Sequence, residues 1–193
     1  MIKRYSGFEA KISTGGEKLP VGGYICKILN PEVVDYDWGS VLVLNIDIDQ
    51  GEYKGFYANQ YKNNTNEDKK WKGTLRVNLP KDDGSEKDGW TKSAFQNVIG
   101  CVEEANNGFR WAWDEQGLKG KLIGVAFREE EWAIGDKSGW ATRPWKAIPV
   151  AAIEDCKIDP KWIEPKPLKN KPVSAIPQTP FAESSADYDL PWN

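Results

Sequence analysis

The sequence predicts a mainly β protein whose body holds three strands, one helix and two further strands, followed by a disordered C-terminal tail. Apolar and polar residues alternate in "SVLVLNIDID", as they do in a half-buried strand. Apolar residues recur at helical spacing in "TKSAFQNVIGCVEEANNG", which indicates one amphipathic helix. Prolines recur through residues 160–180, which excludes a helix or a central strand there.

The first half of the body is expected to be a set of strands. "VGGYICKILNPEVV" predicts a first strand, with Pro31 at a bulge or bend. The next strand, residues 40–49, places Leu42, Leu44, Ile46 and Ile48 on one face. "DQGE" predicts a tight turn, "YKGFYANQYK" a third strand running back, and "GTLRVNLP" a short strand after a polar loop.

The second half is expected to contain the helix and two more strands. Thr91 or Ser93 is placed to cap the helix start and Gly108 to stop it. "KGKLIGVAFREEEW" and "GWATRPWKAIPVAAI" follow as strands joined by "AIGDKSG". This order is that of the OB-fold, a five-stranded, partly open barrel with its helix between strands three and four. We therefore predict an OB-fold domain over residues 1–158, a proline-rich flexible linker over 159–186 and a tip over 187–193.

Composition excludes several classes of chemistry. The chain has 193 residues, a net charge of -3 and no histidine, so Ser-His-Asp catalysis and histidine-ligated metals are excluded. The three cysteines are far apart and form no C-x-x-C pair, which favours buried thiols in a reducing compartment. Without a signal peptide or an apolar span of membrane length, we expect a cytosolic protein that needs no membrane, metal or cofactor.

Aromatic residues beside cations are the main functional signal. The chain has ten Trp, seven Tyr and six Phe, and several stand next to Lys or Arg in "DKKWKG", "FRWAW", "WATRPWK" and "GEYKGFY". Single-stranded nucleic acid needs this mixture, because bases stack on aromatic rings and phosphates need nearby cations. The alternative is that the rings belong to the core and its rim. The predicted nucleic-acid-binding residues are Lys54, Phe56, Tyr57, Lys69, Lys70, Trp71, Lys72, Arg76, Trp140, Arg143, Trp145 and Lys146.

Two questions stay open at this level. A two-residue turn at Gln50 and Gly51 exposes Phe56 on the third strand, whereas a bulge at Gly51 exposes Tyr57 instead. Asp47, Glu52 and Lys54 also resemble the carboxylate-and-lysine set of metal-dependent nucleases. The sequence thus predicts a non-enzymatic binding protein, with a nuclease or a strand-annealing mediator as the alternatives.

The body resembles a family of small single-stranded-DNA-binding proteins encoded by phages of Gram-positive bacteria. The residues that carry the resemblance include "WGSVLVLNIDIDQGEYKGF", "NTNEDKKWKGTLRVNLPKDDGS", "LKGKLIGVAFREEEW" and "GWATRPW", within about residues 8 to 155. The resemblance implies an OB-type barrel that binds displaced single strands during phage replication and recombination, in the cytoplasm of the infected bacterial host. Whether the chain forms homo-oligomers is left open.

The tip "DYDLPWN" is similar to the ends of bacterial single-stranded-DNA-binding proteins, which finish on an acidic run, an apolar residue, proline and phenylalanine. Here Trp192 stands where phenylalanine is usual, and Asn193 follows it. We expect the tip to dock into an apolar pocket with a basic rim on a replication or recombination protein. The alternative is that it packs on its own body. The predicted partner-binding residues are Asp187, Asp189, Leu190, Pro191 and Trp192.

Overall fold

A five-stranded antiparallel sheet forms the centre of the protein, in the order β3-β2-β1-β4-β5. The computed structural model describes residues 18–169. The strands are β1 (Gly22–Tyr36), β2 (Gly39–Ile48), β3 (Thr74–Asn78), β4 (Leu122–Ile134) and β5 (Lys137–Ile148). The helices are α1 (Phe56–Asn63), α2 (Glu86–Ala105), α3 (Val150–Glu154) and the 3₁₀ turns η1 (Glu115–Leu118) and η2 (Pro160–Trp162). The architecture is mixed α/β, with α2 between β3 and β4 as predicted.

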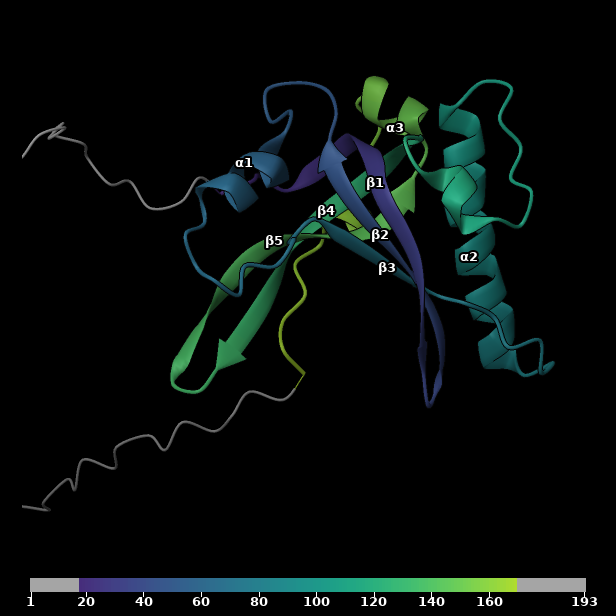
Figure 1. Ribbon diagram of the computed structural model, residues 1–193, viewed down its shortest axis with the longest axis horizontal. Coiled ribbons are helices and arrows are strands. Elements are labelled where there is room, and N and C mark those ends of the chain that lie inside the picture. Colours follow the sequence, from purple (N-terminus) through teal and green to yellow (C-terminus); the bar gives the residue numbers. More distant parts are fainter. Residues whose placement is uncertain (1–17, 170–193) are drawn as a thin grey trace, which may run out of the picture.

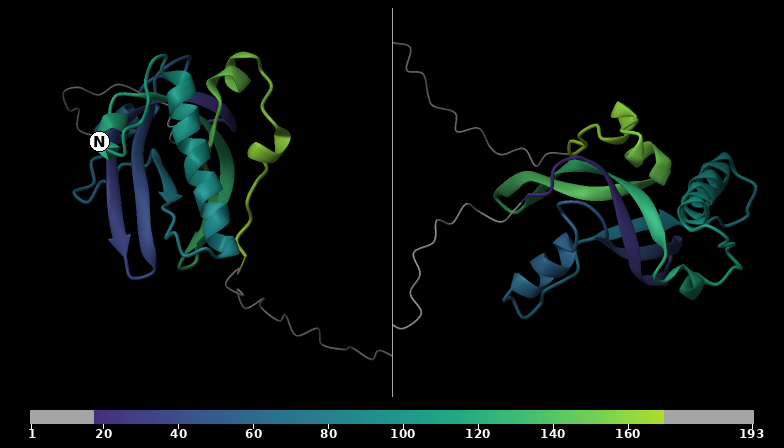
Figure 2. Two further views of the ribbon diagram at one scale, coloured as in Figure 1. Left: turned by 90° about the vertical axis from the view of Figure 1, so that its right-hand side faces the viewer. Right: turned by 90° about the horizontal axis from the view of Figure 1, so that it is seen from above.

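The helices lie around a strongly curved sheet. Figure 1 shows α1 and α2 on opposite sides of the sheet, and the views of Figure 2 show how far the strands bend around one another. The β1–β2 and β4–β5 hairpins project toward the same end of the molecule, with β3 between them.

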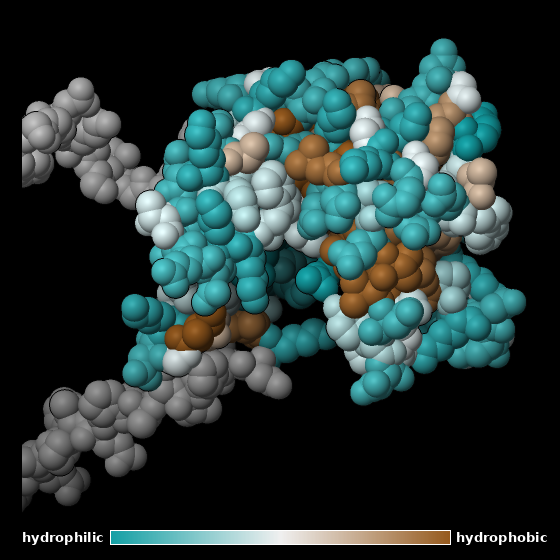
Figure 3. Space-filling model, in the orientation of Figure 1, coloured by the Kyte–Doolittle hydropathy of each residue, from teal (hydrophilic) through white to brown (hydrophobic). Residues whose placement is uncertain are grey.

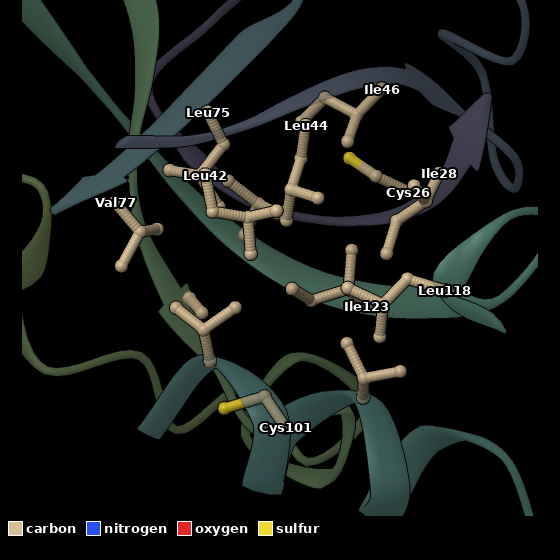
Figure 4. Close-up of a cluster of buried hydrophobic side chains, with 14 of the residues drawn as sticks. Cys26, Ile28, Leu42, Leu44, Ile46, Leu75, Val77, Cys101, Leu118 and Ile123 are labelled. Carbon is tan, nitrogen blue, oxygen red and sulfur yellow. The ribbon is translucent and has the colours of Figure 1, made fainter. Parts of the chain in front are cut away.

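The core is built by the alternation that the sequence shows. Leu42, Leu44 and Ile46 of β2 are almost fully buried and point toward the side chains of the neighbouring strands. On the far side of this cluster, Cys101 projects from α2 (Figure 4). Cys26 and Cys101 are buried free thiols, as expected for small apolar residues, whereas Cys156 is exposed, against that expectation. The predicted strands over residues 21–34 and 40–49 are confirmed, and the register of β1 shifts between Ile28 and Asn30, beside Pro31.

The prediction of a third strand over "YKGFYANQYK" is wrong, because these residues form α1. Gly55 adopts a left-handed conformation, φ 73°, just before the helix. The buried Asp47 carboxylate then accepts hydrogen bonds from the Tyr57 and Ala58 amides, at 2.9 and 3.1 Å. A helix leaves its first amides without partners, and a carboxylate there also suits the helix dipole. A residue of β2 therefore caps α1, and the third strand is β3.

The start of α2 also differs from the prediction. Ser85, rather than Thr91 or Ser93, is the cap, and its hydroxyl accepts a hydrogen bond from the Asp88 amide at 3.1 Å. The helix ends at Ala105, three residues before the predicted stop at Gly108. Gly89 lies inside the first turns, where nothing crowds it. Glycine disfavours helix, so Gly89 makes the sequence pattern place the start of the helix at Thr91 or Ser93, later than its observed start at Glu86.

The first part of the predicted linker lies against the sheet. Lys166 pairs with β4 on both sides of Glu130: its amide donates to Glu129 and its carbonyl accepts from Glu131, at 2.9 and 3.0 Å. We call residues 160–168 the strap. Residues 170–186 of the predicted linker and the whole tip, 187–193, lie outside the described residues. Among the helices of residues 18–169, none has both the length and the apolar composition of a membrane-spanning helix.

Candidate nucleic-acid interface

The outer face of β1, β2 and β3 is the side turned away from the core. Antiparallel partners on neighbouring strands point to the same side, so the register defines this face. Asn30 is opposite Asn45, which is opposite Thr74; Glu32 is opposite Val43, which is opposite Arg76. We call this surface the outer face. Figure 3 shows hydrophobic surface in the region of β1 and β2 beside hydrophilic surface, and the molecule is hollowed toward the β4–β5 hairpin.

An exposed pair of stacked rings stands at the hairpin end of the outer face. Tyr36 and Trp38 are 41% and 55% exposed, their ring centroids are 5.2 Å apart and their planes differ by 8°. The two rings stay exposed instead of packing into the core, and we call the pair the platform. Nucleic-acid bases stack on exposed aromatic rings of this kind. The Arg76 guanidinium on β3 donates a hydrogen bond to the Tyr36 hydroxyl at 3.3 Å. A cation therefore lies beside the platform.

The opposite end of the outer face holds a small pocket. Its volume is about 290 Å³, and we call it the Asn45 pocket. It is lined by Leu29, Asn30, Asn45, Tyr61, Lys69 and Trp71. The Lys69 ammonium lies 4.6 Å from the centre of the Tyr61 ring, a cation–π distance. Aromatic rings and a cation therefore occur at both ends of one sheet face.

The charges near the outer face are mixed. Lys70, Lys72 and Arg76 are exposed, and the Lys81 side chain lies against the hairpin at Gly39. Glu32 is exposed on the same face, and the Asp35 carboxylate accepts a hydrogen bond from the Ser40 hydroxyl. Basic groups thus border a face that also carries the Glu32 carboxylate, in agreement with the net charge of the chain. Phosphate contacts here would be local rather than the result of a broad positive field.

The predicted site residues are distributed over three regions: the outer face, α1 with the turn before it, and β5. Lys69 and Trp71 line the Asn45 pocket and Arg76 lies on the outer face. Lys70 and Lys72 are exposed in the segment that leads into β3. The predicted choice between Phe56 and Tyr57 on a strand does not apply, because both belong to α1: Phe56 is half-buried and Tyr57 is 4% exposed. Lys54 is exposed in the turn before α1.

Tyr57 is a core residue. Its ring stacks on Phe127 with centroids 6.4 Å apart. Burial raises the pKa of the Tyr57 hydroxyl. The neighbouring Cys26 and Asp47 raise this pKa further, whereas the positive charge of Arg143 lowers it. Among the described residues its buried hydroxyl has no hydrogen-bond partner. The phenol is therefore neutral and structural.

The remaining predicted residues lie on β5. Trp140 and Arg143 are exposed, while Trp145 and Lys146 are half-buried. The Trp145 indole donates a hydrogen bond to the carbonyl of Trp162 in the strap, and the Arg128 guanidinium lies 3.9 Å from the centre of its ring. Trp145 is thus covered on one side by the chain itself. A groove of about 760 Å³ runs beside it, between β3, α2 and β5, with Trp90 of α2 69% exposed.

The carboxylates considered for a nuclease do not gather. Asp47 is 7% exposed, and both of its oxygens accept hydrogen bonds from backbone amides. Glu52 and Lys54 are exposed in the turn that follows β2. Over residues 18–169, no group of three or more His, Cys, Asp or Glu side chains is placed to hold a metal ion. The arrangement gives Asp47 a capping role.

Sequence reasoning missed the platform. Tyr36 and Trp38 are flanked by acids in "DYDWG", so the pattern of aromatic residues beside cations does not include them. The predicted third strand includes Tyr61, which lies in α1. The available signal was position: an aromatic pair around the turn of a two-strand hairpin has no core to enter.

No protein-family model matches the chain, and no curated protein matches it.

Proposed function

We propose that the protein binds single-stranded DNA on the outer face, largely without regard to sequence, and that it does so without catalysing a reaction. The observation that carries the proposal is the row of groups along one sheet face: the Tyr36–Trp38 platform, Arg76, and the Asn45 pocket with Trp71 and Lys69. Bases stack on rings of any kind, and backbone phosphates contact the cations between them. Duplex DNA has no free base faces to offer such a platform.

The sheet is proposed to be an OB-type barrel. The order β3-β2-β1-β4-β5 and the contact between β3 and β5 support closure, and α2 is inserted between β3 and β4 as in that fold. In OB-folds the face of strands two and three and the loops beside it bind oligonucleotides. In the proposed barrel, the outer face and the ends of the β1–β2 and β4–β5 hairpins correspond to these positions.

The wider role follows the resemblance of the sequence. We propose membership of the phage single-stranded-DNA-binding family, protection of displaced strands during replication and recombination, and recruitment of a partner protein by the tip. The strand-annealing alternative uses the same binding surface and differs in one measurable property. An annealer accelerates pairing of complementary strands, whereas a protective binder does not.

Tryptophan fluorescence during titration with a short oligonucleotide, at several salt concentrations, tests the proposal. Single-stranded DNA should quench the fluorescence, and log affinity should fall with log salt by about 0.7 per phosphate neutralised. Duplex DNA of the same length should bind much more weakly. Equal affinity for duplex DNA would contradict the preference for single strands. A slope of log affinity against log salt near zero would show that no phosphate contacts contribute to binding.

A further inference from the structure

We propose that the groove between β3, α2 and β5 is a docking site for an acidic segment of another protein, one that carries carboxylates beside a bulky apolar side chain. We call it the α2 groove. It lies on the side of the sheet that α2 covers, whereas the outer face is turned away from the core. The inference therefore goes beyond the proposed function and does not depend on it.

One side of α2 forms a wall of the α2 groove. Residues three or four positions apart lie on the same side of a helix, and this wall is made in that way by Lys87, Trp90, Ala94 and Asn97. The small Ala94 leaves space between its larger neighbours. The Trp90 side chain is 69% exposed, so its ring offers the groove apolar surface that the core does not use.

The other walls come from β3 and β5, the two edge strands of the sheet. The Asn97 amide of α2 donates a hydrogen bond to the Ala147 carbonyl of β5 at 2.9 Å, which fixes the helix against that strand. The groove is thus preformed, and a rigid site loses little entropy on binding. Its volume of about 760 Å³ is within the range of about 300–1,000 Å³ that ligand clefts have. It can hold a short peptide segment but no folded domain.

The charge of the α2 groove is opposite to that of the chain. Arg76, Lys87 and Lys146 line it, and in the part of the chain that the structure describes no Asp or Glu does so. Over the whole chain, acidic residues outnumber basic ones by 29 to 26. Within residues 18–169, none of these three cations is in an ion pair with a carboxylate. Carboxylates of a partner would therefore meet complementary charges that the chain itself leaves uncompensated.

The aromatic residues of the α2 groove favour a peptide over a nucleic acid. Trp145 is covered by the strap and by Arg128, so of the two tryptophans that line the groove only Trp90 offers an exposed ring. A single strand needs several ring faces for successive bases. A peptide needs one apolar contact for its anchor side chain and cations for the acids beside it.

The test uses a fluorescein-labelled hexapeptide of four aspartates, one tryptophan and one leucine, whose binding to the full chain is followed by anisotropy. Lys87→Glu should weaken binding about fivefold, and Trp90→Ala about tenfold. Lys87 is exposed, and a carboxylate in the first turn of α2 suits the helix dipole, so Lys87→Glu should melt as the wild type does. The matched control is Lys119→Glu, the same charge change at an exposed lysine outside the groove, which should leave the affinity unchanged.

The proposal would be overturned if the hexapeptide did not bind, if a version with lysine in place of aspartate bound equally well, or if Lys87→Glu and Lys119→Glu had equal effects. A full chain carrying Asp187→Asn, Asp189→Asn and Trp192→Ala should bind the peptide as the wild type does. Binding to this variant alone would assign the groove to the tip of the chain itself.

A nucleic acid is the remaining alternative occupant of the α2 groove. Saturating single-stranded DNA should leave peptide binding unchanged, and Lys87→Glu should leave DNA affinity unchanged. Displacement of the peptide by DNA, together with a loss of DNA affinity in Lys87→Glu, would assign the groove to nucleic acid and overturn the proposal. None of these peptide results decides whether the outer face binds DNA, which the fluorescence titration tests separately.

Discussion

For Trp145 and Trp38, the charge of the adjacent residues in the sequence gives the wrong expectation of whether the ring is free to bind a ligand. Trp145 stands among cations in "TRPWK", yet its indole bonds to the strap and Arg128 covers its ring. Trp38 stands among acids in "DYDWG", yet it is exposed, stacked on Tyr36, and Arg76 reaches Tyr36 from β3. In the proposed interface, the cation beside the exposed rings comes from a neighbouring strand of the sheet and not from the adjacent residues of the sequence. We therefore expect substitution of Trp145 to affect stability and substitution of Trp38 to affect DNA binding.

The largest effect is expected at Trp145, and on stability. Trp145→Ala removes a ring packed between Arg128 and the strap, and should lower the free energy of unfolding by about 3 kcal/mol, at the low end for a large core ring because Trp145 is only half-buried. DNA affinity of the folded variant should be nearly unchanged. Trp140→Ala on the same strand is the control, since Trp140 is exposed and should cost little stability. A Trp145→Ala protein that melts normally but binds DNA weakly would reverse the comparison.

Trp38 should show the converse. Trp38→Ala should weaken single-strand binding by about 1–3 kcal/mol, the value of one stacked base, and leave the melting temperature unchanged. Trp90→Ala tests whether exposure alone explains the effect, because Trp90 is more exposed than Trp38 but lies on α2. The affinities are measured by anisotropy of a labelled oligonucleotide. Equal losses of affinity in the two variants would mean that the outer face is not the preferred binding surface.

Arg76 should contribute charge rather than stacking. Arg76→Ala should weaken binding to all sequences alike and make the slope of log affinity against log salt shallower by about 0.7, if the guanidinium neutralises one phosphate. Lys157→Ala removes an equally charged group that is paired with Asp155 away from the outer face, and should leave the slope unchanged. An unaltered slope for Arg76→Ala would confine this arginine to its contact with Tyr36.

The smallest effect is expected at Tyr57. A buried hydroxyl without a partner opposes folding, so Tyr57→Phe should raise the free energy of unfolding by up to about 1 kcal/mol and leave DNA binding unchanged. Tyr24→Phe is the matched control: it removes a hydroxyl that donates to the Pro20 carbonyl at 2.9 Å, and should lower stability by about 1 kcal/mol. Chemical denaturation of both variants distinguishes the two cases. Loss of stability in Tyr57→Phe would show that the hydroxyl has a partner after all.

Strong periodicity was sufficient to predict β2 and the central turns of α2, because Leu42, Leu44 and Ile46 need a core whatever surrounds them. It failed for α1, where the deciding contact is long-range: Asp47 of β2 caps a helix that begins nine residues later, at Phe56. The same holds for the site. "DKKWKG" could be found by its composition, whereas the Tyr36–Trp38 platform acquires its cation from Arg76, which only the sheet register brings near.

The pairing of Lys166 with β4 has a consequence for the solution behaviour of the chain. Beyond Phe127, β4 no longer pairs with β1, so the backbone of residues 129–131 would present unpaired amides and carbonyls along an open strand edge. Such edges invite another chain to add a strand. The strap occupies this edge, with Lys166 bonded on both sides of Glu130. A chain shortened at Ile158 would lose that cover, and we expect it to self-associate with rising concentration while the full chain stays dispersed.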